Sequence, residues 1–131
     1  VASTEGALVT PPSASGREPV SIPELKTIHF DYDKSDIRSG DAAILKGNYQ
    51  YLKTNTGRVL IEGHCDERGT NQYNLALGER RANAAKRYMA DLGIDAGRMD
   101  IISYGEERPA VQGSTEEAWA QNRRAEFKAI R

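Results

Sequence analysis

The chain has 131 residues, 28% of them charged, and a formal net charge of −1 at pH 7. So small a net charge disfavours a general nucleic-acid binder and a protein held to membrane surfaces by basic residues, because both need a clear basic excess. The single cysteine excludes an intrachain disulfide framework, and no apolar run approaches the roughly 18–20 residues of a membrane span.

The first part of the chain, residues 1–24, differs in composition from the rest. It holds four of the five prolines together with several Ser, Thr and Gly residues, and it sustains neither a helical nor an alternating apolar pattern. Such a composition is typical of a linker that its prolines partly extend. We therefore predict a flexible Pro/Ser-rich tether over residues 1–24 and one folded domain over residues 25–131.

Regular patterns fill the remainder of the chain. In chain order, the sequence predicts a strand at 27–30, a helix capped by Ser39 or Asp41 that runs to about Thr54, a strand at 58–64, a helix ending near Leu92, a strand at 98–104, a short helix at 115–120 and a strand at 123–130. Glycines follow both long helices, and Gly93 is a natural stop for the second. In the last strand, Ala125, Phe127 and Ala129 alternate with charged residues, which indicates one buried face.

The predicted order, β-α-β-α-β-(α)-β, favours an α/β fold. We expect a two-layer sandwich in which a mixed sheet carries its helices on one face. Right-handed crossovers place the acidic loop at 31–36 and the polar loop at 65–71 at the same end of the sheet, since both follow the carboxyl ends of strands. We expect a ligand at that end.

His64 and Cys65 raise the possibility of nucleophilic or metal chemistry. Adjacent side chains of a strand point to opposite faces, so these two residues cannot form a catalytic dyad with each other. A metal site built from His29, His64, Cys65 and Asp66 is also disfavoured, because the close spacings typical of metal ligands are absent. We prefer a hydrogen-bonded strand histidine and a small buried thiol.

A polar stripe on the long second helix is a better candidate site. Asn74, Gly78 and Arg81 follow one another at spacings of four and three, and Asp66 lies on the loop that leads into this helix. Glycine is unfavourable in the middle of a helix by about 1 kcal/mol, which suggests a close approach at Gly78. One acid, one guanidinium and one amide suit a zwitterion, with Asp66 on an ammonium and Arg81 on a carboxylate. A structural ion pair between Asp66 and Arg81 explains the spacing equally well.

Four segments, in the same order, resemble the OmpA-like peptidoglycan-binding domain. They are the residues Phe30–Ile37, Ile61–Thr70 with Tyr73–Asn74 and Leu77–Ala82, Ser103–Pro109, and Asn122–Arg124. The match runs from about Ile28 to Ile130. Within the family, residues 66–70 and 78–84 are most similar to its lipid-anchored subgroup.

The resemblance implies roles for particular residues. Asp66 and Arg81 would hold the diaminopimelate end of the peptidoglycan stem peptide, and Asn74 and Asp36 would assist. The residues expected to line or shape the groove are Phe30, Asp31, Asp33, Gly63, Cys65 and Leu77. Cys65 departs from the family pattern, which usually has a small residue such as Thr or Ala there.

The resemblance also implies a non-catalytic protein without a cofactor or metal. It would sit at the periplasmic face of the outer membrane, anchored by a lipidated cysteine upstream of Val1, and act in the Tol system with TolB as a partner. An alternative is a module whose main ligand is another protein, either a TolB-type partner or the partner of a stator-type or porin-type member, with cell-wall binding secondary.

Overall fold

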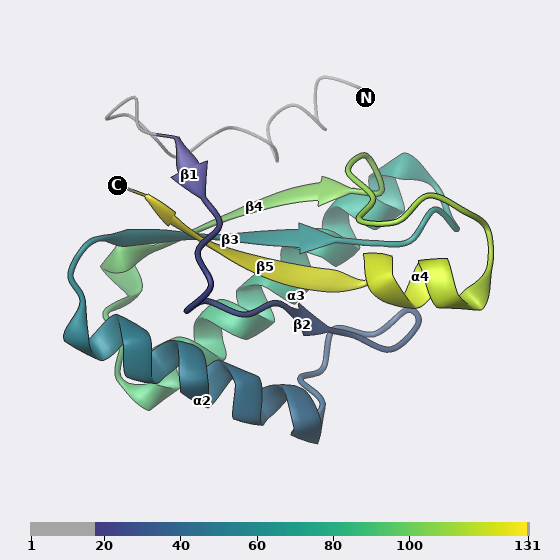
Figure 1. The fold of residues 1–131 in the computed structure, drawn as a ribbon. Helices are drawn as coiled ribbons and strands as arrows, with labels where there is room; N and C mark the ends of the chain where they lie inside the picture. Colours follow the sequence, from purple (N-terminus) through teal and green to yellow (C-terminus); the bar gives the residue numbers. More distant parts are fainter. Residues whose placement is uncertain (1–17, 131) are drawn as a thin grey trace.

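The computed structural model describes residues 18–130. Its elements in chain order are the strands and helices β1 (Pro19–Val20), β2 (Ile28–His29), α2 (Ser39–Thr54), β3 (Arg58–His64), α3 (Asn71–Leu92), the 3-10 turn η1 (Ala96–Arg98), β4 (Met99–Gly105), α4 (Glu116–Asn122) and β5 (Arg124–Ile130). The strands form one sheet in the order β1-β5-β3-β4, with β2 also paired to β5 (Figure 1). β3 and β4 run parallel, whereas β5 is antiparallel to its neighbours. The predicted α/β sandwich with a mixed sheet is confirmed.

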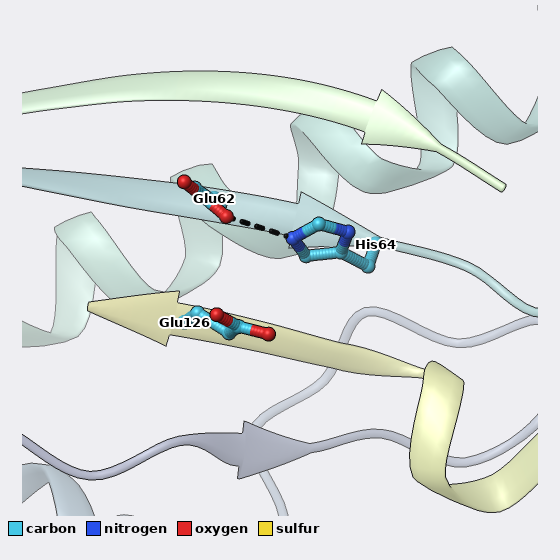
Figure 2. Close-up of side chains that lie close together, drawn as sticks. All are labelled: Glu62, His64 and Glu126. Atoms are coloured by element: carbon cyan, nitrogen blue, oxygen red, sulfur yellow. Dashed lines mark hydrogen bonds and ion pairs between the residues drawn. The ribbon is translucent and has the colours of Figure 1, made fainter. Parts of the chain in front are cut away.

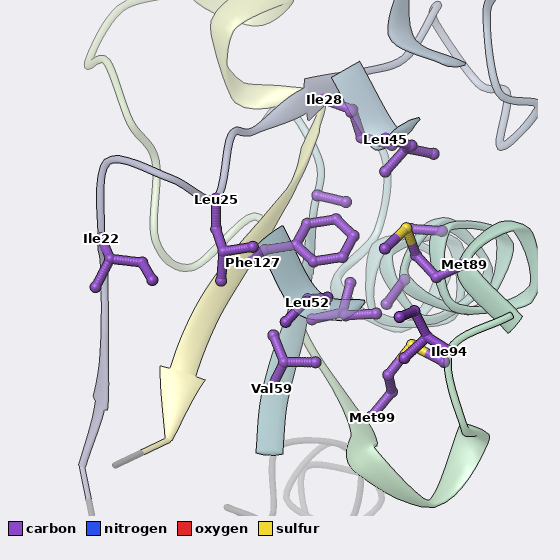
Figure 3. Packing of buried hydrophobic residues seen from close by; sticks show 14 of the residues in the cluster. Ile22, Leu25, Ile28, Leu45, Leu52, Val59, Met89, Ile94, Met99 and Phe127 are labelled. Atoms are coloured by element: carbon purple, nitrogen blue, oxygen red, sulfur yellow. The ribbon is translucent and has the colours of Figure 1, made fainter. Parts of the chain in front are cut away.

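The main core lies between the sheet and the two long helices. Leu45 of α2 and Met89 of α3 pack in one cluster with Phe127 of β5 (Figure 3). Ile61 of β3 belongs to the same cluster. Strand alternation explains which residues reach it, since Ile61 faces the helices while its neighbour Leu60 belongs to a small second cluster. Burying each such side chain contributes about 1.5–3 kcal/mol. The predicted placement of the helices on one face of the sheet follows from this shared core.

The ends of α3 follow the expected capping chemistry. Thr70 precedes the helix, and its hydroxyl accepts a hydrogen bond from the Tyr73 amide at 3.1 Å. Gly93 follows it with φ +126° and donates its amide to Met89 and Ala90, as a helix stop should. α3 is amphipathic and charged; in residues 18–130, no helix combines the length and the apolar composition that a membrane crossing requires.

The start of α2 differs from the prediction. The helix begins at Ser39, but the capping position belongs to Arg38, which makes no side-chain capping bond. Asp41 is not a cap either, because its carboxylate accepts from Arg38 Nε at 2.7 Å and from the amide of His29 at 3.5 Å. The Asp41 carboxylate therefore connects α2 to β2 and does not cap the helix.

Packing begins before the predicted boundary at residue 24. Pro19 and Val20 pair with the end of β5, and Ile22 is buried in the main core. A proline is tolerated there because β1 is an edge strand. The folded part of the chain therefore reaches back to Pro19, and the rest of the predicted tether, residues 1–17, lies outside the described residues.

Candidate functional site

The loops that follow β2 and β3 meet at one end of the sheet, as predicted. They enclose a cavity of about 150 Å³ with the first turns of α3. We call it the Asp66 cavity; it is lined by Tyr32, Asp33, Cys65, Asp66, Arg68, Gly69, Tyr73, Asn74, Leu77 and Arg81. Six of the ten predicted site residues are among them, namely Asp33, Cys65, Asp66, Asn74, Leu77 and Arg81.

Two glycines set the position of the cavity walls. A Cβ on Gly63 of β3 would overlap the carbonyl group of Gly78 in α3, and a Cβ on Gly78 would overlap the Ser103 hydroxyl and lie 3.0 Å from the Gly63 oxygen. The helix and strand backbones are therefore in direct contact, which explains the glycine in mid-helix. Gly63 shapes the site from behind but does not line the cavity.

Arg81 is a buried guanidinium, only 1% exposed, whose hydrogen bonds go to backbone carbonyls. Nε donates to Lys34 O at 2.8 Å, Nη1 to His64 O at 2.9 Å, and Nη2 to Asp31 O at 3.2 Å. The Phe30 ring lies 5.2 Å from its centre. Within the described residues it forms no ion pair with a carboxylate, and burial lowers the pKa of Arg81 from its ordinary value. The side chain thus presents a buried positive charge that has no carboxylate within ion-pair distance among the described residues.

Asp66 is equally buried, at 4% exposed, but it is paired. Arg68 donates to it from its backbone amide and from two guanidinium nitrogens at 2.9–3.2 Å, and Arg123 Nη1 lies 3.6 Å away. Burial of the carboxyl opposes ionisation, but the hydrogen bonds from Arg68 and the charges of Arg68 and Arg123 outweigh it, so the pKa of Asp66 lies below its ordinary value. The expected alternative of a direct Asp66–Arg81 ion pair is wrong, because each residue has other partners.

Asn74 organises the cavity wall. Its Nδ2 donates to the carbonyls of Asp66 and Arg68 and to the carboxylate of Glu106, which ties the loop after β3 to the loop after β4. The amide nitrogen of Asn74 is therefore already used in hydrogen bonds that stabilise the site. Its predicted contact with a ligand stays a prediction.

Cys65 is a buried thiol beside Asn74. Its Sγ donates to the Asn74 carbonyl at 3.2 Å, and burial raises the pKa of the thiol to about 11. So weakly acidic a thiol has almost no thiolate at neutral pH and is a poor nucleophile. His64 projects from the opposite face of the sheet, as the alternation of strand residues predicted.

Three further predicted residues, Phe30, Asp31 and Asp36, do not line the cavity. Phe30 is buried beneath Arg81, and Asp31 offers Arg81 its backbone oxygen while its carboxylate pairs with Arg38 at 3.2 Å. Asp36 lies in a separate, shallower depression of about 450 Å³ against the outer side of α3. Phe30 and Asp31 therefore contact Arg81 from outside the cavity, which is compatible with the predicted role of shaping the groove, and the assisting role of Asp36 stays a prediction.

Four residues of the cavity were missed, namely Tyr32, Arg68, Gly69 and Tyr73. Tyr73 was within reach of sequence reasoning, because it lies four residues before Leu77 and eight before Arg81 on the same side of α3. Its hydroxyl is hydrogen-bonded to the Asp33 carboxylate. The position of Arg68 depends on Tyr32 and on Trp119, whose rings lie 4.0 and 3.9 Å from its guanidinium carbon. Because Tyr32, Arg68 and Trp119 are far apart in the sequence, no short sequence pattern predicts their contact.

The opposite face of the sheet carries another polar cluster, Glu62, His64 and Glu126 (Figure 2). His64 Nε2 lies 3.1 Å from Glu62 Oε1. Arg124 binds Glu126, and Lys128 Nζ lies 3.5 Å from Glu62. These two cations balance the two carboxylates, so the cluster has no excess negative charge to attract a metal ion.

Comparison with known proteins gives a consistent result. A model of the OmpA family matches residues 29–123. The peptidoglycan-associated lipoprotein of Pseudomonas putida is 41% identical over 134 residues, which covers 95% of this chain and 81% of that protein. The peptidoglycan-associated lipoprotein of Haemophilus influenzae is 51% identical over 100 residues, which covers 76% of this chain and 65% of that protein.

A solved structure shows the same similarity in three dimensions. The crystal structure of the peptidoglycan-associated lipoprotein from Burkholderia pseudomallei superposes with a TM-score of 0.76 at 40% identity, covering 81% of this chain and 90% of that one. The predicted resemblance to the lipid-anchored subgroup is thereby confirmed. Each of these relatives is named a peptidoglycan-associated lipoprotein, in agreement with the prediction of a non-catalytic binding protein.

Proposed function

Because this chain belongs to the OmpA family, we propose that it binds peptidoglycan non-covalently through the diaminopimelate-containing stem peptide and so tethers the outer membrane to the cell wall. Support comes from its relatives, which are named for their association with peptidoglycan. The site is the Asp66 cavity, whose volume of about 150 Å³ suits the end of a side chain rather than a sugar ring.

The observation that carries the proposal is the unpaired charge of Arg81. Its guanidinium lines the cavity, is fixed by three backbone carbonyls and has no carboxylate partner among the described residues. A guanidinium has five N–H donors, and three are used. Two remain to bind a carboxylate, and the guanidinium itself is already held in position.

The second half of the site is an acid. The free end of diaminopimelate carries an ammonium and a carboxylate on one carbon atom. Asp66 and Arg81 both line the small cavity, so a ligand carboxylate on Arg81 brings the adjacent ammonium toward Asp66. A lysine side chain has only the ammonium and provides no carboxylate to pair with Arg81. The cavity therefore favours diaminopimelate over lysine.

Similarity to the peptidoglycan-associated lipoproteins supports a proposal for the cellular role. The protein acts at the periplasmic face of the outer membrane, where an N-terminal lipid anchor upstream of Val1 holds the domain within reach of the cell wall. We place it in the Tol-Pal system, with TolB as its protein partner and with no nucleic acid, cofactor or catalytic step. The envelope role needs only reversible binding, for which the cavity supplies two fixed charges of opposite sign.

The proposal is tested by cosedimentation with purified sacculi whose stem peptides contain diaminopimelate. We expect wild-type protein to sediment and the Asp66→Asn variant to remain in solution. Glu24→Gln is the matched control, because Glu24 is exposed and is not part of the cavity. A circular dichroism spectrum and melting curve like those of the wild type confirm that the variant is folded.

A second variant, Arg81→Lys, keeps the charge but loses the forked geometry. We expect it also to lose sacculus binding, whereas Arg58→Lys, at the other end of β3, retains it. If both Asp66→Asn and Arg81→Lys sedimented like the wild type, the clamp would be refuted and the alternative of a protein-interaction module would take its place.

A further inference from the structure

In the ligand-free protein the carboxylate of Asp66 already binds a cation. Arg68 reaches it with Nε at 3.2 Å from Oδ1 and with Nη2 at 2.9 Å from Oδ2. This is the two-point geometry that makes arginine–carboxylate pairs strong. The position in which a ligand ammonium would sit is therefore occupied by a side chain of the protein itself.

Arg68 is held in this place from both sides and yet remains accessible. The Tyr32 ring and the Trp119 ring sandwich its guanidinium at 4.0 and 3.9 Å. Its side chain is 30% exposed, whereas that of Asp66 is 5% exposed. Arg68 can thus leave the carboxylate by a side-chain rotation, without any change in the backbone that carries it.

Arg123 contacts the same carboxylate from the protein interior. Its side chain is 8% exposed, Nε donates to the Phe30 carbonyl at 2.9 Å, and Nη2 donates to Glu116 at 3.2 Å. Nη1 is buried without a hydrogen-bond partner among the described residues and points to Asp66 Oδ2 at 3.6 Å. Two of its three nitrogens are fixed elsewhere, so Arg123 cannot follow Arg68 out of the site.

We propose that Arg123 is the fixed partner that positions the Asp66 carboxylate, and that Arg68 is an internal substitute for the ligand ammonium, displaced from Asp66 when the ligand binds. This rests on the proposed function. Arg123 keeps the carboxylate oriented after Arg68 has moved, and the Tyr32 and Trp119 rings stay beside the cavity entrance.

Displacement gives the site a basis for selectivity. An amine that replaces Arg68 exchanges one cation for another at Asp66 and gains little, because the carboxylate was already paired. A zwitterion gains in addition the contact between its carboxylate and Arg81, which nothing in the described chain provides before binding. Competition from Arg68 therefore weakens the binding of simple amines. A ligand that also carries a carboxylate beside its ammonium binds Arg81 and is preferred.

The first test follows the arginine side chains directly. The full chain, labelled with nitrogen-15, is titrated with a muropeptide carrying meso-diaminopimelate, and the Nε–H signals of Arg68 and Arg123 are recorded. We expect the Arg68 signal to shift along the same binding curve as the backbone amides of residues 65–69. The Arg123 signal, whose N–H is bonded to Phe30, stays in place.

The second test compares ligands in the variant Arg68→Gln, with Arg58→Gln as the matched control. Because both ligands carry an ammonium that must displace Arg68, removing this partly exposed ion pair should increase the affinity for the diaminopimelate and the lysine muropeptide alike, by about fivefold. Arg68→Lys restores a cation beside Asp66 and should bring both affinities part of the way back toward those of the wild type. Melting curves of the variants separate this effect from a loss of folding.

The outcomes separate the two proposals. If wild-type protein binds the muropeptide while the Arg68 signal stays fixed, or if Arg68→Gln binds both muropeptides no more tightly than the wild type, the internal-substitute model is overturned and the clamp remains. If the wild-type chain binds neither muropeptide, the proposed function fails and this inference fails with it.

Discussion

Gly63 of β3 and Gly78 of α3 lie backbone against backbone, and neither position has room for a methyl group. Each of these glycines lies three residues before one of the two central charges, since Asp66 follows Gly63 and Arg81 follows Gly78. The contact therefore fixes how far apart the acid and the guanidinium stand. A small change in the spacing of strand and helix would move one wall of the cavity relative to the other.

Alanine at Gly78 tests this contact. The added Cβ would overlap the Ser103 hydroxyl, so Gly78→Ala should lower the free energy of unfolding by about 1–3 kcal/mol. Urea unfolding followed by circular dichroism measures it. Gly47→Ala is the matched control, because Gly47 also lies in a helix but has nothing within 4 Å of its would-be Cβ. That variant should gain about 0.5–1 kcal/mol, and equal effects at the two positions would contradict the close contact.

Arg81 has a structural role as well as a binding role. Arg81→Ala leaves the carbonyls of Asp31, Lys34 and His64 without their donor, so we expect a loss of about 3 kcal/mol or more in the free energy of unfolding. Arg81→Lys should lose less, because it fills the space and keeps one donor group. Thermal melts of both variants show whether Arg81→Ala is the less stable of the two. An Arg81→Ala protein as stable as the wild type would show that the three hydrogen bonds to backbone carbonyls contribute little.

The thiol of Cys65 should be inert. Because its pKa is raised to about 11 and the residue is buried, native protein should not react with a disulfide reagent at pH 7.5, whereas protein in urea should give one thiol per chain. We also expect Cys65→Ala to retain sacculus binding, since the Sγ bond goes to the Asn74 carbonyl and not into the ligand position. Rapid modification of the native thiol would place Cys65 on an accessible wall.

The pH dependence of stability should carry a contribution from His64. Burial lowers the pKa of His64 from its ordinary value near 6.5; a hydrogen bond with Glu62 opposes the shift and the charge of Arg124 adds to it. The unfolded chain therefore takes up the proton first, so this contribution is complete above pH 6.5 and is lost as the pH falls through the folded-state pKa.

We expect the free energy of unfolding to fall by about 1 kcal/mol between pH 7 and pH 5.5 for this reason. Urea titrations at several pH values measure the slope. His64→Gln should flatten it, and His29→Gln, which removes a half-buried histidine that also has a lowered pKa, shows how much of the slope belongs to the other imidazole. An unchanged slope in His64→Gln would mean that the folded protein protonates His64 freely.

Local signals account for most of what the sequence predicted correctly. The long helices and the strands were placed within one or two residues, because apolar spacing and glycines such as Gly93 act over a single turn. β1 was missed, since two residues that include Pro19 show no alternation, and their strand conformation depends on pairing with β5.

The site was predicted less completely than the fold. Helix spacing and family resemblance both pointed to Asp66 and Arg81, but neither gave the direction of every neighbouring side chain, and Phe30 and Asp36 do not line the cavity. Arg68 is the clearest omission. Its placement between Tyr32 and Trp119 depends on loops brought together by the sheet, which no short stretch of sequence records.

The most direct measurement of the central claim is a backbone amide titration with two muropeptides that differ only in carrying meso-diaminopimelate or lysine. The account predicts shifts that saturate for the diaminopimelate ligand at residues 65–69 and around Arg81, with much weaker shifts for the lysine ligand. Equal responses to the two ligands, or shifts confined to surfaces away from the Asp66 cavity, would contradict it.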